Sequence, residues 1–139
     1  MMQRLFYIGT LFAILFAVGC SKTVVIKGTA KMADGTTIDN GTVYFNGEKD
    51  QYSADIQSDG TFSPGVTKDG GGIPPGVYKV TVSGVVAYEG ETIVLPNGSS
   101  IYPKTVPLID PKYGNATTSG LSIDTSKSKT LDLELEPAL

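Results

Sequence analysis

The sequence predicts an all-β protein, built as a single antiparallel sandwich or small barrel. Short runs of residues alternate between apolar and polar side chains, most clearly at 131–135, which reads Leu-Asp-Leu-Glu-Leu. Alternation with a period of two indicates strands with one buried and one solvated face, as in antiparallel sheets. No segment after Cys20 repeats apolar residues at helical spacing, and turn-forming pairs separate the runs. Short strands divided in this way are typical of sandwiches and barrels.

Each alternating segment predicts one strand, and its apolar positions predict the buried face. In the first segment Val24, Ile26, Gly28 and Ala30 share a face. The predicted strands lie at 24–30, 42–45, 52–56, 77–82 and 131–136. Asp-Gly and Asn-Gly pairs at 34–35, 40–41, 59–60, 69–70 and 97–98 supply residues that tolerate positive φ, as tight turns require. The segments 93–95 and 100–102 flank one such pair and predict a further hairpin, inserted between the main strands.

The first residues have the features of an export signal. A single charge, Arg4, precedes the uncharged apolar run 5–18. A membrane-spanning helix needs about 20 apolar residues, so this run is short for a permanent anchor. It suits the helical apolar region of a secretory signal peptide, with small residues at the cleavage site. We therefore expect an N-terminal signal helix ahead of the sandwich.

The end of this signal, Ala17-Val18-Gly19-Cys20, resembles the lipobox of bacterial lipoproteins, although Ala17 stands where Leu is commoner. The resemblance implies cleavage after Gly19 and acylation of Cys20. Cys20 is also the sole cysteine, so no disulfide can form within the chain. We expect a signal peptide at 1–19, a lipidated end and tether at 20–22, and the β domain at 23–139. Ser21 resembles the sorting pattern for the outer membrane, which implies a membrane-anchored protein of the cell envelope.

Charge and residue content exclude several function classes. Removing 1–19 also removes Arg4, which leaves 10 basic against 14 acidic residues and a net charge of −4. A mildly acidic domain without arginine has no basic stripe for phosphates, so nucleic acid is not an expected partner. The chain has no histidine, which removes Ser-His and Cys-His nucleophiles and the usual zinc ligands.

The order of several short motifs resembles carboxypeptidase-regulatory-like, or transthyretin-like, domains of small bacterial lipoproteins. The motifs are VIKGTA at 25–30, GTVYF at 41–45, YSAD at 52–55, DGTF at 59–62, PGVYKVTV at 75–82 and the tail from Val106 to Leu133. The resemblance spans most of residues 23–136. It implies a transthyretin-like or Ig-like sandwich of about seven strands. Transthyretin-like hydrolases rely on histidines, so the resemblance does not extend to that activity.

Acidic residues leave two chemical alternatives, and the pattern favours neither. A pair of carboxylates could act as in glycosidases, but most of the acids lie in turns or on the polar side of strands. Calcium takes six to eight oxygens, and Asp34, Asp39, Asp59 and Asp69 lie in loops. No D-x-D-x-D-G run occurs, and Asp-Gly is ordinary turn chemistry. We expect no enzyme activity, no catalytic residues, no metal site and no cofactor.

Binding is the remaining function class, and the loop-rich stretch 85–118 is its candidate site. Tyr88, Tyr102 and Tyr113 lie there, and aromatic rings on loops of a rigid sandwich can anchor a protein or stack on sugars. The alternative is that these rings pack against the ends of the sandwich. Two hypotheses follow: a structural or protein-interaction module of the envelope, and a module that binds envelope glycans. The expected partners are the membrane, through Cys20, and envelope proteins or glycans.

Overall fold

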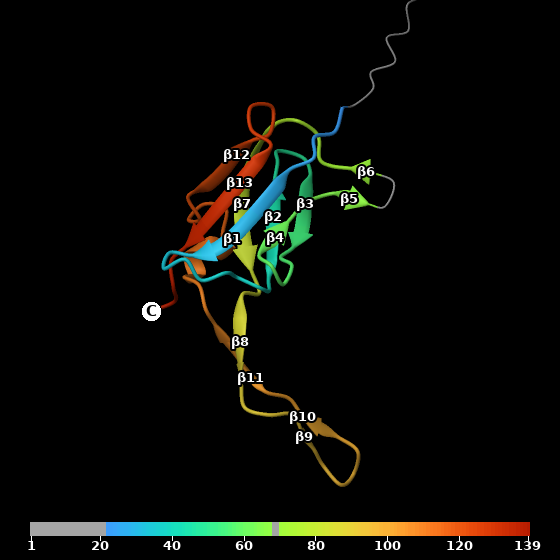
Figure 1. Ribbon diagram of the computed structural model, residues 1–139, viewed down its shortest axis with the longest axis vertical. Coiled ribbons are helices and arrows are strands. Elements are labelled where there is room, and N and C mark those ends of the chain that lie inside the picture. The colour runs from blue at the N-terminus through green and yellow to red at the C-terminus, as the bar shows by residue number, and fades with distance from the viewer. Residues whose placement is uncertain (1–21, 68–69) are drawn as a thin grey trace, which may run out of the picture.

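The body of the protein is a β-sandwich made of a three-stranded and a four-stranded sheet (Figure 1). The computed structural model describes residues 22–67 and 70–139. The strand orders are β13-β1-β4 and β12-β7-β2-β3. The seven strands are β1 (Lys27–Met32), β2 (Thr42–Asn46), β3 (Gln51–Asp55), β4 (Thr61–Phe62), β7 (Val77–Ser83), β12 (Leu121–Asp124) and β13 (Thr130–Leu135). The all-β prediction is confirmed; the predicted signal helix at 1–19 and the lipid-bearing Cys20 lie outside the described residues.

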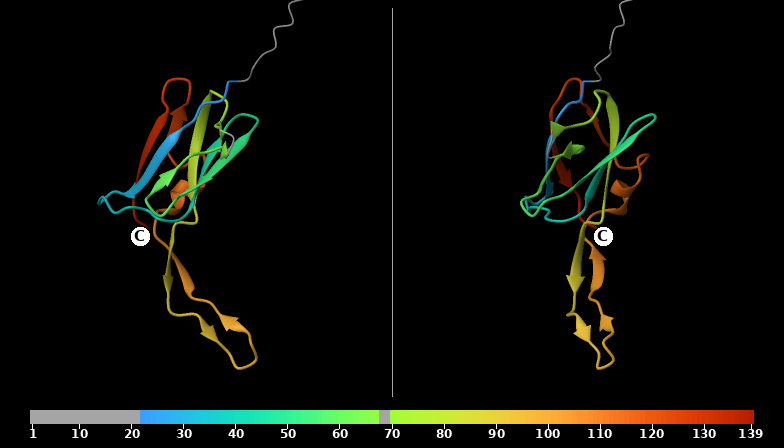
Figure 2. Two further views of the ribbon diagram at one scale, coloured as in Figure 1. Left: turned by 45° about the vertical axis from the view of Figure 1, so that its right-hand side comes forward. Right: turned by 90° about the vertical axis from the view of Figure 1, so that its right-hand side faces the viewer.

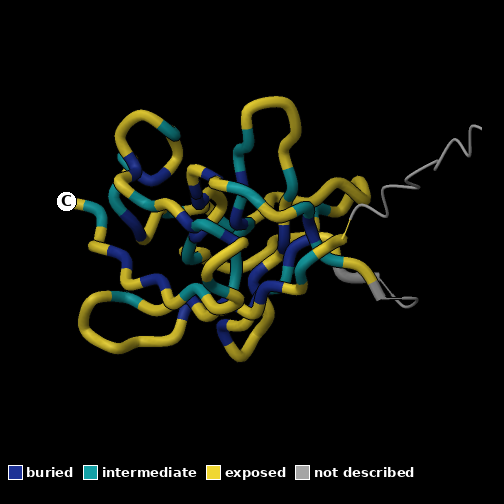
Figure 3. Tube along the Cα trace, turned by 90° about the horizontal axis from the view of Figure 1, so that it is seen from above, coloured by how far each residue is buried: buried dark blue, intermediate teal, exposed yellow. Residues whose placement is uncertain are grey.

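The alternation in the sequence becomes the inner face of the sandwich. Ile26, Val43, Phe45 and Val80 are completely buried, and Leu133 is nearly so. Seen along the long axis, buried and exposed positions alternate along the chain (Figure 3). The inward-pointing residues of both sheets form one continuous apolar core. The predicted buried faces of these segments are therefore confirmed.

One strand pair differs from the antiparallel prediction. The first strand, β1, pairs with the last, β13, in parallel, from Lys27 opposite Thr130 to Met32 opposite Leu135. Each of these strands has one buried and one exposed face. The same alternation would occur in an antiparallel pair, so it does not indicate the direction of the strands. The rest of the domain connects the two strands, so no tight turn fixes their direction. The prediction of wholly antiparallel sheets was wrong for this pair.

The predicted turns have the expected backbone. Gly35, Gly41, Gly60 and Gly98 all have φ between +84° and +111°. At Gly60 there is also no room for a side chain, because a Cβ would lie 2.8 Å from Thr37 Cγ2 and 3.0 Å from a backbone oxygen. Glycine therefore serves both conformation and packing at this turn. The pair at 69–70 lies partly outside the described residues.

A long two-stranded arm, residues 86–107, projects from one end of the sandwich; we call it the finger (Figures 1 and 2). Its lower part pairs β8 (Val86–Glu89) with β11 (Lys104–Pro107), and its tip pairs β9 (Ile93–Val94) with β10 (Ser100–Ile101). The hairpin predicted at 93–102 is confirmed, as the outer part of this longer arm. The described chain starts at the opposite end of the sandwich (Figure 1).

Two small elements complete the fold. β5 (Val66–Thr67) and β6 (Gly70–Gly71) form a short hairpin beyond β4. A 3₁₀ helix, η1 (Pro111–Gly114), follows the finger. The side chain of Asp110 accepts a hydrogen bond from the Lys112 N–H and caps this helix. Pro111 suits the first turn, where its missing N–H costs nothing.

Candidate functional site

The finger carries most of the large apolar side chains that are exposed in the described part of the chain. Nine such side chains are exposed in total, and five of them lie on the finger. They are Tyr88 (66% exposed), Ile93 (54%), Val94 (69%), Ile101 (52%) and Tyr102 (76%). Scattered exposed apolar residues are normal, but a group of them on one projecting element is typical of an interaction site.

The tip of the finger is an antiparallel hairpin closed by a tight turn. Ile93 lies opposite Ile101 on one face, and Val94 lies opposite Ser100 on the other. The tip turn is closed by the Gly98 N–H, which donates to the Leu95 carbonyl at 2.9 Å, and by Asn97, whose side chain accepts from the Ser99 N–H at 3.0 Å. The apolar side chains therefore flank a polar tip. An isolated two-stranded hairpin is marginally stable in water, so contacts with a partner would stabilise this element.

One asparagine fixes the finger to the sandwich. The Asn40 side-chain amide donates to the Val86 carbonyl at 2.9 Å and accepts from the Val86 N–H at 2.9 Å. The Leu108 N–H donates to the Val85 carbonyl at 3.0 Å and closes the base of the finger. Asn40 belongs to a predicted turn pair, and its side chain also sets where the finger leaves the body.

The structure separates the three tyrosines proposed as binding residues. Tyr88 and Tyr102 are exposed on the finger, whereas Tyr113 lies in η1 and is only 4% exposed. The Tyr113 hydroxyl accepts a hydrogen bond from the Glu136 N–H at 2.9 Å, and the Lys112 ammonium lies 5.2 Å from the ring centroid. The prediction of Tyr113 as a binding residue was wrong, because the capped helical turn directs its ring into the body. The Asp110-Pro111 pair was the sequence signal for that turn.

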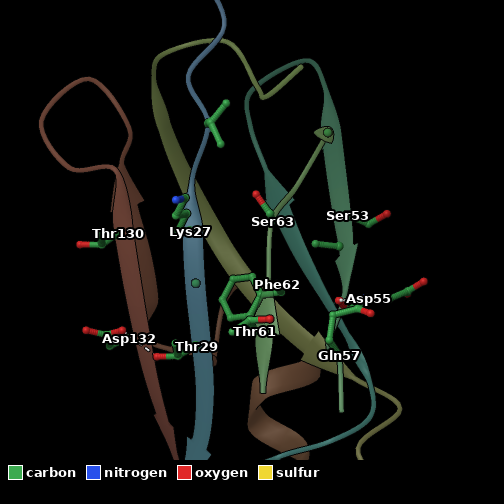
Figure 4. Close-up of a pocket in the computed structure, with 14 residues that line it drawn as sticks. Lys27, Thr29, Ser53, Asp55, Gln57, Thr61, Phe62, Ser63, Thr130 and Asp132 are labelled. Carbon is green, nitrogen blue, oxygen red and sulfur yellow. Dashed lines mark hydrogen bonds between the residues drawn. The ribbon is translucent and has the colours of Figure 1, made fainter. Parts of the chain in front are cut away.

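A second surface feature is a groove that the sequence reasoning did not find; we call it the β3–β4 groove. It has a volume of about 1100 Å³ and lies between the edge of β3 and strands β4, β1 and β13 (Figure 4). Its polar lining includes Lys27, Thr29, Asp55, Gln57, Thr61 and Asp132, and Val25, Ala54 and Phe62 add apolar surface. The lining residues come from four segments, 25–29, 53–57, 61–65 and 130–132, so no single local motif marks the groove.

Phe62 and Gly28 explain the shape of the groove beside β4. They are direct partners in the β1–β4 pairing. A Cβ on Gly28 would lie 2.1 Å from the Phe62 ring, so the ring occupies the space of the missing side chain. Glycine inside a strand often marks such a close approach, and this was the available sequence signal.

Two of the four loop aspartates considered as calcium ligands, Asp34 and Asp59, are engaged in their own turns, and Asp69 lies outside the described residues. The Thr36 N–H donates to Asp34 at 2.9 Å, and the Thr61 hydroxyl donates to Asp59 at 2.6 Å. These hydrogen bonds hold the pKa of both carboxyls below its usual value. Within 22–67 and 70–139, no group of three or more His, Cys, Asp or Glu side chains could hold a metal ion. In the same ranges no helix is long and apolar enough to cross a bilayer.

Comparison with known proteins gives distant likenesses in structure alone. The chain matches no protein-family model, and no curated protein matches its sequence. Two crystal structures are similar to it, the major pilin subunit BcpA of Bacillus cereus and a single-residue variant of that pilin. The identities are 12% and 13%, with TM-scores of 0.41 and 0.42. The matches cover 84% and 82% of this chain, and the chain spans 30% of the length of the pilin in each.

Proposed function

We propose that this protein is a non-catalytic lipoprotein of the cell envelope, whose finger acts as its contact element for protein partners. The observation that carries the proposal is the group of five exposed apolar side chains on the finger. Their burial against a partner would be favourable by roughly 25 cal/mol for each Å² removed from water. A rigid sandwich that presents such an element is suited to binding, and the absence of histidine from the sequence argues against the commonest hydrolytic mechanisms.

The direction of the finger supports this proposal. The described chain begins at Lys22, two residues after Cys20, at the end of the sandwich opposite the finger (Figure 1). A lipid on Cys20 would hold that end at the membrane, since two or more acyl chains give stable attachment. The finger would then lie at the end of the molecule remote from the anchor, where it can reach proteins of the envelope. We also propose that the sandwich is related to carboxypeptidase-regulatory-like domains, which its sequence motifs resemble.

The anchor is tested with Cys20→Ala in the full chain. We expect the wild-type protein to incorporate labelled fatty acid and to sediment with membranes. The variant should incorporate none and should leave the outer-membrane fraction. Fatty-acid incorporation that is unchanged in the variant contradicts lipidation at this cysteine.

The contact element is tested by cross-linking intact cells that express the full chain. The variant Ile93→Asp/Ile101→Asp places charges on the apolar face of the finger and should remove the cross-linked complexes. Val77→Asp is the matched control, because Val77 is 66% exposed on the sandwich itself. Complexes that persist in the finger variant but disappear in the control contradict the proposal.

Glycan binding is the second candidate function, and the exposure of Tyr88 and Tyr102 keeps it open. Both rings are accessible for stacking on sugars. The test is retention of the full-length protein on purified envelope glycans, compared with Tyr88→Ala/Tyr102→Ala. Equal retention of both proteins excludes this function for the finger.

A further inference from the structure

The outer edge of β3 offers unused backbone hydrogen bonds. Hydrogen-bonded pairs alternate along an antiparallel ladder. The Ile56 N–H donates to the Gly41 carbonyl and the Gly47 N–H donates to the Asp50 carbonyl, which fixes the pattern of the β2–β3 ladder. The N–H and C=O groups of Gln51 and Ser53 therefore point away from β2. Among the described residues β3 is an edge strand, and no backbone hydrogen bond reaches these groups.

The β3–β4 groove lies along this edge. Ser53, Ala54 and Asp55 of β3 line one side of it, and Phe62 of β4 contributes to the other (Figure 4). An extended segment placed in the groove could add to the four-stranded sheet beside β3. Its side chains would point alternately toward the apolar lining and toward solvent. Strand addition at a free edge gives affinity through the backbone and specificity through alternate side chains.

The finger has the complementary properties. Each of its strands pairs on one side only, and Ile93, Val94 and Ile101 are exposed beside those edges. Its 22 residues, 86–107, compare with the roughly 20–30 residues that each partner contributes to a stable interface. Glu89 and Lys104 pair across the finger, and Lys27 and Asp55 line the groove, so each surface offers a positive and a negative charge to the other.

One molecule cannot bring its own finger to its own groove. The finger extends away from one end of the sandwich, whereas the groove lies along the body beside β3 and β4 (Figures 1 and 4). Each chain therefore has one groove beside a free strand edge and one exposed apolar hairpin. A second copy can supply the hairpin that the groove of the first copy receives.

We propose that the finger of one molecule docks in the β3–β4 groove of the next and adds a strand to β3. This inference rests on the proposed function of the finger and names its partner as a second copy of this chain. The two surfaces differ, so the contact can repeat head-to-tail from copy to copy. A row of molecules then gives a ladder of oligomers, whereas two copies that exchanged fingers would give a closed pair.

The test uses cysteine pairs in the full-length, membrane-bound protein. Two differently tagged copies are expressed together, one with Ile93→Cys and the other with Ser53→Cys, and disulfides are formed by mild oxidation. Ser122→Cys is the matched control for the groove side. Ser122 is an exposed serine on β12, the other edge of the same sheet, and its N–H also points outward.

We expect the 93–53 pair to form about ten times more disulfide than the 93–122 pair, which corresponds to about 1.4 kcal/mol in favour of the groove. Both cysteines on one chain should give a ladder of oligomers. Ser53→Pro should prevent association without unfolding the protein, because proline is tolerated where an edge N–H faces solvent. Ser122→Pro should leave association unchanged, and circular dichroism should show that both variants are folded.

Other outcomes overturn the inference. Equal 93–53 and 93–122 yields, or a predominant 93–93 disulfide, would show that the groove does not receive the finger. If the finger cross-links to a different protein and never to a second copy, this inference fails while the proposed function stands. If no complex depends on the finger at all, both fail together.

Discussion

At the scale of single residues, small local contacts decide how closely the strands approach and how the turns close. Phe62 covers Gly28 across the β1–β4 pair and takes the place of a side chain there. Asp34, Asp59 and Asp124 each accept hydrogen bonds from the residue two positions later and fix their turns. Two of these residues, Asp34 and Asp59, are among the four aspartates considered as calcium ligands.

Gly28→Ala should destabilise the fold. The new methyl group would lie within the volume of the Phe62 ring, which must move, and overpacking of this kind costs about 1–3 kcal/mol. Unfolding in urea would measure the loss. Gly114→Ala is the control, because a Cβ at Gly114 meets no atom within 4 Å. Adding Phe62→Leu should recover part of the loss, and a double variant with additive losses would contradict the contact.

Stability should fall in acid because of the turn aspartates. Hydrogen bonds from Thr36, Thr61 and Ser126 lower the folded-state pKa of Asp34, Asp59 and Asp124 below the usual 3.8. Their contribution is present above that value and is lost as the pH falls through the lower, folded-state pKa values. Urea unfolding at a series of pH values should show this loss. Asp59→Asn should weaken the pH dependence, and an unchanged pH dependence in this variant would contradict the role of the turn aspartates.

At the scale of elements, the sequence predicted strands well and their partners less well. Alternation at 24–30 or 131–136 reports which side chains are buried, because burial has the same period as the strand. It does not report strand direction, so the parallel pairing of β1 with β13 could not be predicted. The hairpin at 93–102 was predicted from its turn, but its outward projection depends on Asn40, which is far away in the sequence. The groove joins four segments and has no local signal.

Asn40→Ala should loosen the base of the finger and leave the sandwich folded. The change removes two hydrogen bonds to Val86, and a lost hydrogen bond typically costs about 1 kcal/mol. Hydrogen exchange should show faster exchange at 86–89 and 104–107. The core strands β2 and β7 should keep their protection. Equal loss of protection in both regions would mean that Asn40 supports the sandwich itself.

At the scale of the whole molecule, the sandwich is a support and the finger is the element that it presents. The core joins the inner faces of the two sheets with buried residues of the connecting segments, such as Ile73 and Tyr113, while most of the exposed large apolar side chains lie beyond it on the finger. Tyr88 and Tyr102 were predicted at this surface from residue type alone. For Tyr113 the Asp110-Pro111 pair signalled a turn but not the burial of the ring, because burial depends on how η1 packs against the body.

Removal of the finger should therefore leave the fold intact. Replacing residues 87–106 with an Asn-Gly turn joins two positions that are already paired, Val86 and Pro107. We expect the melting temperature to change by less than about 4 °C, since the core is untouched. Circular dichroism with thermal unfolding measures this. A large drop would show that the sandwich depends on the finger.

The central claim is that the finger makes the contacts of this protein, and site-specific photo-cross-linking in intact cells tests it most directly. A photoreactive residue in place of Tyr102, at 76% exposure, is compared with one in place of Val77, at 66% exposure on the sandwich. We predict discrete cross-linked products from position 102 and few or none from position 77. Products from position 77 alone, with none from position 102, would contradict the account.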